Sequence, residues 1–324
     1  MSGNAHDPET LARVYRSLRL IRRVEEEVAR IYPSDKIKSP VHLSIGQEAV
    51  AVGICDVLKP DDIMSATYRG HAGYLAKGGD LKQMMAELYG KGTGCAGGKA
   101  GSMHLVDMSA GVLGMSAVVG TTIPIAAGYA LALKREAQRK NTCRIAAGFM
   151  GDGATEEGVF AETLNFAALH KLPVLLVCEN NGFAIHSPTS NRWATKALCE
   201  RVATYGIPTH EISDGNVFSI REVAEKAISE IRAGGGPQFM ECHTYRWREH
   251  VGPNEDYDDG YRSRDDFKPW QDNDQVALTG AMLDATARDA IDAEIEAEIA
   301  EAVDFAEQSP WPQPEELFSH VFAD

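Results

Sequence analysis

Hydrophobic residues recur along this chain at two different spacings. In the first part they fall three or four residues apart, at Leu11, Val14, Leu18, Ile21, Val24 and Val28. This helical spacing follows Asp7-Pro8, an N-cap residue before a first-turn proline, and predicts a helix over residues 8–32. Comparable patterns predict helices over residues 44–59, after Pro124, over 220–234 and around 291–303.

The centre of the chain combines the two patterns. Residues 144–150 and 173–179 are nearly continuous apolar runs of strand length, and the segment between them has helical periodicity. Strands that are apolar throughout are typical of a parallel sheet covered on both faces. A further helix and a strand over 238–247 extend the pattern. We therefore predict an α/β fold, with a parallel sheet and helices on both faces.

The domain organisation follows from the same patterns. We expect an N-terminal helical segment over residues 1–40, an α/β domain over 41–270 and a C-terminal helical tail over 271–324. Residues 248–270 contain seven acidic residues against three arginines and a lysine, and we predict a long exposed loop there. No internal repeat separates these parts.

Composition excludes several classes of function. The net charge of −15 argues against nucleic-acid binding, which requires clustered lysine and arginine. The longest apolar runs are too short to cross a bilayer, and the first ten residues do not resemble a signal peptide. The six cysteines form no C-x-x-C pair, which favours reduced thiols. We expect a cytoplasmic enzyme or binding protein, with no membrane partner.

The sequence MGDGATEEGVF, residues 150–160, follows the first central strand. It fails as a dinucleotide fingerprint, because Glu156 stands where the third glycine is needed. It does place Asp152 at a strand end, where parallel sheets bind ligands, before a helix expected to begin near Ala154. A carboxylate beside a bound phosphate requires a cation between them, and Mg²⁺ suits oxygen ligands.

A second polar motif follows the next strand. Asn181 lies 29 residues after Asp152, in CENNGF. If the two strands are neighbours, both side chains lie at the same edge of the sheet and together bind one ion. Each motif alone also fits a structural role, Asp152 as a helix cap and Asn181 as part of a tight turn. Their spacing within a strand–helix–strand unit favours the metal site.

The wider sequence resembles a known family. G-D-G followed after about thirty residues by N-N is similar to the thiamine diphosphate motif. The segments TYRGHAGYLAKGGD, GGKAGSMH, GDGATEEGVFAETLNFAALHKLPVLLVCENNGFAI and ECHTYRWREH resemble alpha chains of the decarboxylating component of 2-oxoacid dehydrogenase complexes. Pyruvate, branched-chain 2-oxoacid and acetoin dehydrogenases belong to this group. The resemblance extends over residues 10–265 and implies the thiamine diphosphate-binding fold.

The resemblance implies thiamine diphosphate and Mg²⁺ as cofactors and assigns site residues by position. The metal ligands would be Asp152, Asn181 and the backbone carbonyl of Phe183. The remaining cofactor-binding residues would be Tyr68, Arg69, Ala117, Val119, Gly153, Ala154, Ile185 and His250. Among them, Ile185 would be the apolar wedge that bends the cofactor, and Ala117 and Val119 would hold the aminopyrimidine through backbone groups.

Two of the ten histidines are expected to act in catalysis. His71 and His250 stand where the family has active-site histidines, which help to position substrate and transfer protons or acyl groups. His104 is left open between a catalytic and a structural role. His42, His186 and His243 are assigned to structure.

The resemblance also implies a reaction and partners. The enzyme would be an oxidoreductase that cleaves a 2-oxoacid or acetoin next to the carbonyl and passes the acyl group to a lipoyl-bearing acyltransferase. An activating glutamate would come from a separate beta subunit, in an assembly of two alpha and two beta chains. A two-chain transketolase-like enzyme, an acyloin-forming thiamine enzyme and a non-catalytic regulatory subunit are the alternatives.

Two departures from the family pattern bear on function. Phe183 replaces the tyrosine of the pyruvate enzymes, and Val251 stands where the mammalian enzymes carry a regulatory serine. The segment RWREHVGP is closer to acetoin dehydrogenases, whereas NNGFAI is closer to the branched-chain type. The sequence therefore leaves the substrate open.

Overall fold

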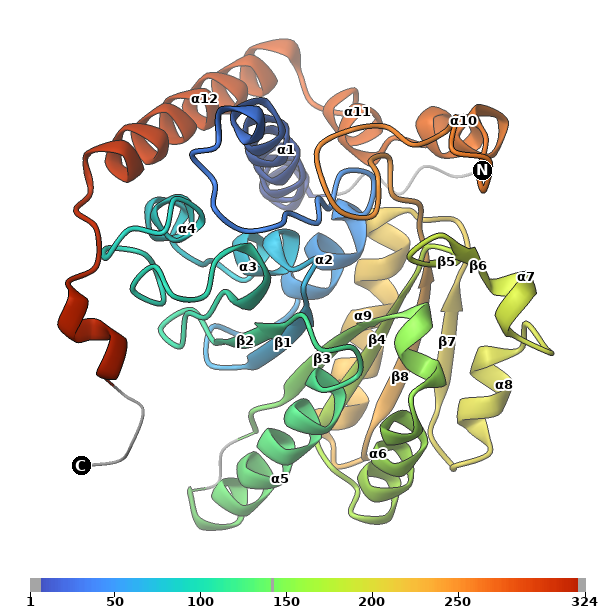
Figure 1. Ribbon diagram of the computed structural model, residues 1–324. Helices are drawn as coiled ribbons and strands as arrows, with labels where there is room; N and C mark the ends of the chain where they lie inside the picture. Colours follow the sequence, from blue (N-terminus) through green and yellow to red (C-terminus); the bar gives the residue numbers. More distant parts are fainter. Residues whose placement is uncertain (1–6, 141–142, 320–324) are drawn as a thin grey trace.

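A six-stranded parallel sheet forms the centre of the protein (Figure 1). The structure is a computed structural model that describes residues 7–140 and 143–319. The strand order is β2-β1-β3-β4-β8-β7. The strands are β1 (Ile63–Thr67), β2 (Val112–Ser116), β3 (Ala146–Gly151), β4 (Val174–Asn180), β7 (Thr209–Ile212) and β8 (Gln238–His243). A separate antiparallel pair consists of β5 (Phe183–Ala184) and β6 (Ser187–Pro188).

Helices cover both faces of the sheet, as the apolar strands predict. One face packs against α5 (Thr122–Lys140), α6 (Gly158–Leu169) and α8 (Leu198–Ala203), and the other against α2 (Glu48–Cys55) and α9 (Val217–Arg232). Alternate residues of β4 enter the two cores, because neighbouring side chains on a strand point to opposite faces. All seven residues of β4 are buried. The predicted fold class is confirmed.

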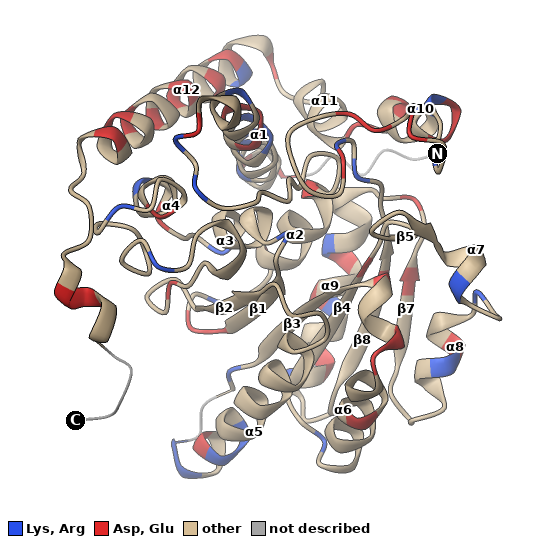
Figure 2. Cartoon of the chain, in the orientation of Figure 1, with Lys and Arg blue, Asp and Glu red and all other residues tan. Residues whose placement is uncertain are grey.

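Further helices pack around α2 and one another at the outer side of this face (Figure 1). They are α1 (Pro8–Ile31), α3 (His71–Ala76), α4 (Leu81–Leu88) and α12 (Ala285–Gln308). The Asp7 carboxylate accepts a hydrogen bond from the Thr10 amide, so α1 begins as predicted. Ion pairs join α1 to α12, at Arg16–Glu298, Arg19–Asp292 and Arg23–Glu296. Figure 2 shows that both helices are rich in charged residues. None of the described helices is long and apolar enough to cross a membrane.

Some elements differ from the sequence predictions. The short strands β1, β2 and β7 were not predicted, and α2 occupies only the middle of the helix expected over residues 44–59. The helix expected to begin near Ala154 begins at Gly158, because a 3₁₀ turn over Asp152–Glu156 precedes it. The remaining helices are α7 (Thr189–Arg192), α10 (Arg264–Asp272) and α11 (Gln275–Gly280).

The glycine-rich segment after α4 is organised by a buried carboxylate. Glu87 of α4 accepts backbone hydrogen bonds from Ala96, Gly98, Ala100 and Gly101, at 2.7–3.0 Å. Gly98 has φ of 76°, and a Cβ there would lie 2.7 Å from the backbone of Gly90. Glycine is therefore required at this position, because the segment packs closely against backbone while it surrounds the Glu87 carboxylate.

The charged segment predicted as an exposed loop is partly buried. Asp256 pairs with Arg246 and Arg262, and the side chains of all three are at most 2% exposed. Burial of two guanidinium groups around one carboxylate fixes the segment after β8, since an unpaired charge there would be costly. The predicted loop is present over residues 248–263, but the prediction of an exposed loop over residues 248–270 is correct only in part, because ion pairs bury Asp256 and Arg262 and α10 begins at Arg264.

Candidate functional site

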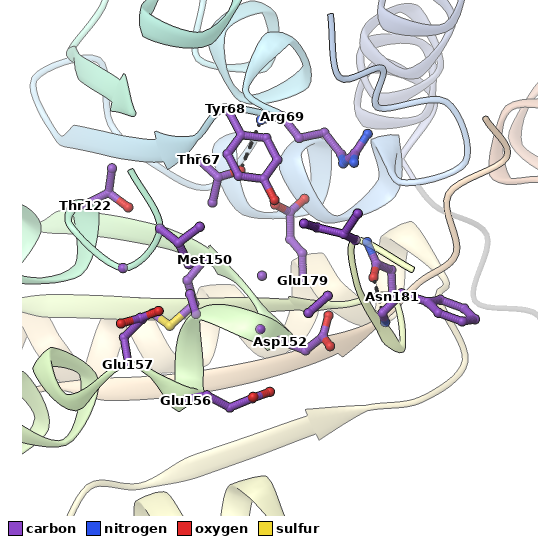
Figure 3. Close-up of a pocket in the computed structure, with 18 of the residues that line it drawn as sticks. Thr67, Tyr68, Arg69, Thr122, Met150, Asp152, Glu156, Glu157, Glu179 and Asn181 are labelled. Atoms are coloured by element: carbon purple, nitrogen blue, oxygen red, sulfur yellow. Dashed lines mark hydrogen bonds between the residues drawn. The ribbon is translucent and has the colours of Figure 1, made fainter. Parts of the chain in front are cut away.

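A cavity of about 310 Å³ opens where β1, β3 and β4 end (Figure 3). The chain leaves β1 toward β2 on one side, whereas β3 leads to β4 on the other, so the strand order diverges here. Ligands of parallel α/β sheets bind at such a divergence, outside the carboxyl ends of the strands. Tyr68 and Arg69 follow β1, Asp152 follows β3, and Asn181 follows β4.

The sheet brings the two predicted metal ligands together. β3 and β4 are neighbours, with Gly151 paired to Glu179, so Asp152 and Asn181 leave adjacent strands at the same level. The backbone of Asn181 lies close enough to the Asp152 carboxylate to lower its pKa, against the larger opposing effect of burial. The Asn181 side-chain amide donates to the Gln47 side-chain oxygen at 3.0 Å. The amide oxygen of Asn181 accepts a hydrogen bond of 3.1 Å from the Phe183 backbone N–H, and its second lone pair can bind a metal.

The Asp152 carboxylate is buried and already faces a cation. Its side chain is 1% exposed and pairs with the Arg192 guanidinium, which also pairs with Glu156. Burial raises the pKa of Asp152, although the charge of Arg192 lowers it. A buried carboxylate and a carboxamide oxygen are a donor set that suits Mg²⁺. The residues present therefore fit a hard divalent cation. This cation would displace the Arg192 guanidinium from the Asp152 carboxylate.

Two glycines flank Asp152 with different surroundings. A Cβ on Gly153 would lie 2.8 Å from the Cβ of Ala184, so a side chain there would collide with β5. A Cβ on Gly151 would meet nothing within 4 Å. Both glycines line the cavity, together with Ala154. The turn thus presents bare backbone to a ligand, as a diphosphate-binding segment requires.

Tyr68 and His250 form an aromatic wall with His42. The ring centroid of Tyr68 lies 4.4 Å from that of His42 and 5.6 Å from that of His250. Burial lowers the pKa of His250 to about 3, and the Arg69 charge contributes in the same direction. A neutral imidazole near pH 7 offers one hydrogen-bond donor and one hydrogen-bond acceptor to the cavity. His250 therefore lies where the sequence places it, and His42, assigned to structure, supports it.

Arg69 is buried beside this wall. Its guanidinium donates to the backbone carbonyl of Leu43 at 2.7 Å and to that of His250 at 3.1 Å. Burial lowers the pKa of Arg69 to about 10, which still leaves the side chain charged at neutral pH. The cavity consequently contains a fixed cation suited to an anionic ligand.

Ile185 has an unusual backbone conformation. Its φ is 55°, in the left-handed region that β-branched residues avoid, and its side chain lines the cavity. The Ile185 carbonyl accepts a hydrogen bond of 3.0 Å from the buried Arg246. Strain of this kind persists where surrounding contacts impose it, and it is concentrated at functional sites. This geometry fits the predicted apolar wedge.

The cavity does not include every predicted residue. Val119 and Phe183 line it, whereas Ala117 does not, although its neighbours Ser116 and Val118 do. His71 lies outside it and is fully buried. The His71 ring is hydrogen-bonded to Glu25 at 2.9 Å and to Ser102 at 2.8 Å. In this structure His71 connects helices around the site and does not face the cavity. His104 and His186 also lie outside the lining.

Several charged residues of the site were missed by sequence reasoning, among them Glu179 and Arg192. Glu179, the second-last residue of β4, lines the cavity, and burial raises its pKa to about 7 against the opposing effect of Arg69. A carboxyl group of this kind can hold or release a proton near neutral pH. Its position in CENNGF, two residues before Asn181, was the available signal. Arg192 carried no signal, because it lies 40 residues from Asp152 in the sequence.

Exposed apolar residues surround the mouth of the cavity. Val118, Val119 and Ile185 line the cavity and are 62%, 46% and 55% exposed. Val251, next to His250, is also exposed. Apolar groups gathered at the rim of a site are typical of a surface that another molecule covers.

Comparisons with known proteins agree with this geometry. The family described as "Dehydrogenase E1 component" matches residues 16–315. The alpha subunit of acetoin:2,6-dichlorophenolindophenol oxidoreductase from Bacillus subtilis is 36% identical over 95% of this chain and 92% of its own length. That from Cupriavidus necator is 37% identical over 98% and 95% of the two chains. The pyruvate dehydrogenase E1 component subunit alpha of Zymomonas mobilis is 37% identical over 97% and 89%.

A solved structure shares the fold at greater distance. A transketolase from Leishmania mexicana superposes with a TM-score of 0.57 at 19% identity. The alignment includes 92% of this chain but only 46% of the transketolase. This likeness concerns the fold alone.

Proposed function

The chain belongs to the dehydrogenase E1 component family, and we propose that it is the alpha subunit of a thiamine diphosphate-dependent dehydrogenase acting on a 2-oxoacid or on acetoin. The curated relatives are named as alpha subunits of acetoin and pyruvate enzymes, over almost their full lengths. The observation that carries the proposal is the position of the buried Asp152 and the half-buried Asn181 in the cavity lining, where the neighbouring strands β3 and β4 end.

In this proposal the chain holds the diphosphate half of the cofactor through Mg²⁺. Asp152, Asn181 and the carbonyl of Phe183 bind the metal, and the backbone of Gly153 and Ala154 lies against the diphosphate. Arg69 contributes a buried positive charge. Thiamine diphosphate, when bound, supplies the carbon that adds to the carbonyl and stabilises the charge left by C–C cleavage.

The residues of this chain perform the remaining tasks in the cavity. The neutral His250 imidazole lies beside Tyr68 and can donate and accept hydrogen bonds that position a substrate. The Ile185 side chain projects from a strained backbone and restricts the shape of the bound cofactor. His71 has a supporting role in this proposal, because its two ring nitrogens are engaged by Glu25 and Ser102.

A beta subunit is the first expected partner. The apolar rim of Val118, Val119 and Ile185 needs a cover, and a second chain would bury it and exclude water from the site. We propose that this chain supplies the activating glutamate, and that the assembly contains two alpha and two beta chains. The acyl group would then pass to a lipoyl-bearing acyltransferase. All six cysteines are free, which supports a reducing, cytoplasmic location.

Calorimetry tests the metal and cofactor site. Thiamine diphosphate is titrated into the co-purified alpha and beta chains, with and without Mg²⁺. We expect Mg²⁺-dependent binding that Asp152→Asn abolishes, because the neutral amide cannot balance the ion. Asp304→Asn, an exposed change on α12, is the matched control and should bind normally. Equal affinity in Asp152→Asn and the parent would contradict the assignment.

Reduction of ferricyanide or lipoamide tests the reaction. Pyruvate, branched-chain 2-oxoacids and acetoin are compared with sugar phosphates as substrates. We expect turnover of a 2-oxoacid or acetoin only when both chains are present. Activity of the alpha chain alone would rule out the shared active site, and turnover of sugar phosphates would favour the transketolase-like alternative.

A further inference from the structure

Three side chains able to bind a metal meet on one face of the sheet edge, apart from the cofactor cavity. Glu211 of β7 and Glu241 of β8 are register partners, and His243 follows Glu241 by two residues. Because side chains alternate along a strand, all three point to the same face. One ligand atom from each residue lies within 4.8 Å of the other two.

The charges of this cluster are unbalanced. Glu241 is 2% exposed, and within residues 7–140 and 143–319 no lysine or arginine pairs with it. Its carboxylate accepts a hydrogen bond of 2.7 Å from the Asn180 side chain, a neutral donor. Like charges on directly opposed strand positions destabilise a sheet, and a buried carboxylate requires a cation. Glu211 and Glu241 together therefore favour a positive group between them.

The distances suit a transition metal. His243 Nε2 lies 3.0 Å from a Glu211 carboxylate oxygen and 3.8 Å from one of Glu241. Tetrahedral ligands at the usual zinc bond lengths stand about 3.3 Å apart, between these two values. An imidazole nitrogen combined with carboxylates favours Zn²⁺ and its neighbours over Mg²⁺.

From these contacts we propose that Glu211, Glu241 and His243 form a binding site for a divalent transition metal of the zinc type. The side chains of Glu211 and His243 are 56% and 32% exposed, which leaves the fourth position open to water. Asn180 orients the Glu241 carboxylate from outside the site. The metal would in turn fix Asn180, whose side-chain oxygen accepts from the Gly182 amide in the turn around Asn181. The site would brace the loop that carries Asn181.

Cobalt titration tests the proposal. The full-length chain without an affinity tag is stripped of metal and titrated with Co²⁺ in excess Mg²⁺, so that oxygen-only sites are occupied. We expect one equivalent to bind with visible d–d absorption and to be displaced by Zn²⁺. His243→Gln and Glu211→Gln should each weaken Co²⁺ binding by at least about tenfold.

Two variants distinguish this site from Co²⁺ binding at other histidines or in the cofactor cavity. His210 lies next to Glu211 but on the opposite face, hydrogen-bonded to Gln238 at 3.0 Å, so His210→Gln should bind Co²⁺ as the parent does. Asp152→Asn should also retain binding. Three results would overturn the proposal: no Co²⁺ bound in the presence of Mg²⁺, equal affinity in His243→Gln, or loss of binding in Asp152→Asn alone. If circular dichroism shows that His243→Gln does not fold, the Co²⁺ affinity of Glu211→Gln, a change at an exposed position, is compared with that of the parent. Equal affinity would then overturn the proposal.

Discussion

Single residues set the charge of the candidate site, and Arg192 is the least expected of them. Its guanidinium pairs with Asp152 and Glu156, and it stacks near Trp193 at 5.9 Å from the ring centroid. A cation therefore faces the buried Asp152 carboxylate before any metal binds. Arg192 and Mg²⁺ compete for one position, because both require the same carboxylate.

Replacing Arg192 by alanine should make the chain depend on Mg²⁺ for stability. The buried Asp152 carboxylate would lose its counter-charge, and we expect a loss of about 3 kcal/mol in the metal-free chain. Mg²⁺ should restore most of this loss, and half-saturation should need less Mg²⁺ than in the parent. Urea unfolding at several Mg²⁺ concentrations measures both effects.

Arg201→Ala is the control for this change. Arg201 donates to the Thr155 backbone carbonyl at 3.3 Å, in the same region, but does not pair with Asp152. Its response to Mg²⁺ should equal that of the parent. If Mg²⁺ stabilises Arg192→Ala no more than Arg201→Ala, Arg192 and Mg²⁺ do not compete for the Asp152 carboxylate.

At the scale of elements, buried carboxylates fix the segments that sequence patterns leave undefined. Glu87 of α4 collects four backbone N–H groups of the glycine-rich segment, and Asp256 holds Arg246 and Arg262 after β8. Charge-assisted hydrogen bonds of this kind are stronger than neutral ones. These segments are consequently ordered without regular secondary structure.

Glu87→Gln should therefore be strongly destabilising despite its similar shape. One carboxylate oxygen of Glu87 accepts from Ala96 and Gly98, and the other from Ala100 and Gly101. The amide nitrogen of glutamine cannot accept, so two N–H groups that face the buried Glu87 side chain lose their partner, at a cost of about 3 kcal/mol. Denaturant unfolding measures this loss.

The control for this change is Glu222→Gln, at an exposed position of α9. It removes the same charge without freeing a buried donor, and its stability should stay within about 0.5 kcal/mol of the parent. Similar losses in both variants would mean that net charge, and not the hydrogen bonds of Glu87, is responsible.

At the scale of the whole molecule, the buried His42 and the half-buried His250 connect the site to stability. Burial lowers the pKa of His42 and of His250 to about 3, from an ordinary value of 6.5. Between these values the unfolded chain binds protons at both imidazoles, whereas the folded chain does not. Protons therefore favour the unfolded chain in this window, and the free energy of unfolding rises with pH from about 3 to about 6.5.

Substitution of His42 should reduce this pH dependence. In His42→Gln one of the two shifted groups is absent, so stability should rise less steeply between about pH 4 and pH 6.5 than in the parent. Above pH 7 both histidines are neutral in the two states, and the slopes should be equal. Urea midpoints across this pH range give the comparison, and identical slopes below pH 6 would show that His42 is not held neutral.

Much of the fold and half of the site could be predicted from the sequence alone. Periodicity identified α1, β3 and β4, because apolar spacing records which faces an element buries. Asp152 and Asn181 were identified because each follows an apolar strand directly. The edge strands β2 and β7 were missed, because they are short and incompletely buried and so lack a strong pattern.

The tertiary structure alone decided the rest of the site. Packing of the sheet brought Arg192 to Asp152, and burial gave Glu179 a pKa of about 7, although neither effect has a local sequence pattern. It also enclosed His71 between Glu25 and Ser102, away from the cavity that its motif suggested. Local sequence determines which elements form and where their polar ends lie. The partners and charge states of those ends depend on burial and on contacts between distant segments, which exist only after the chain has packed.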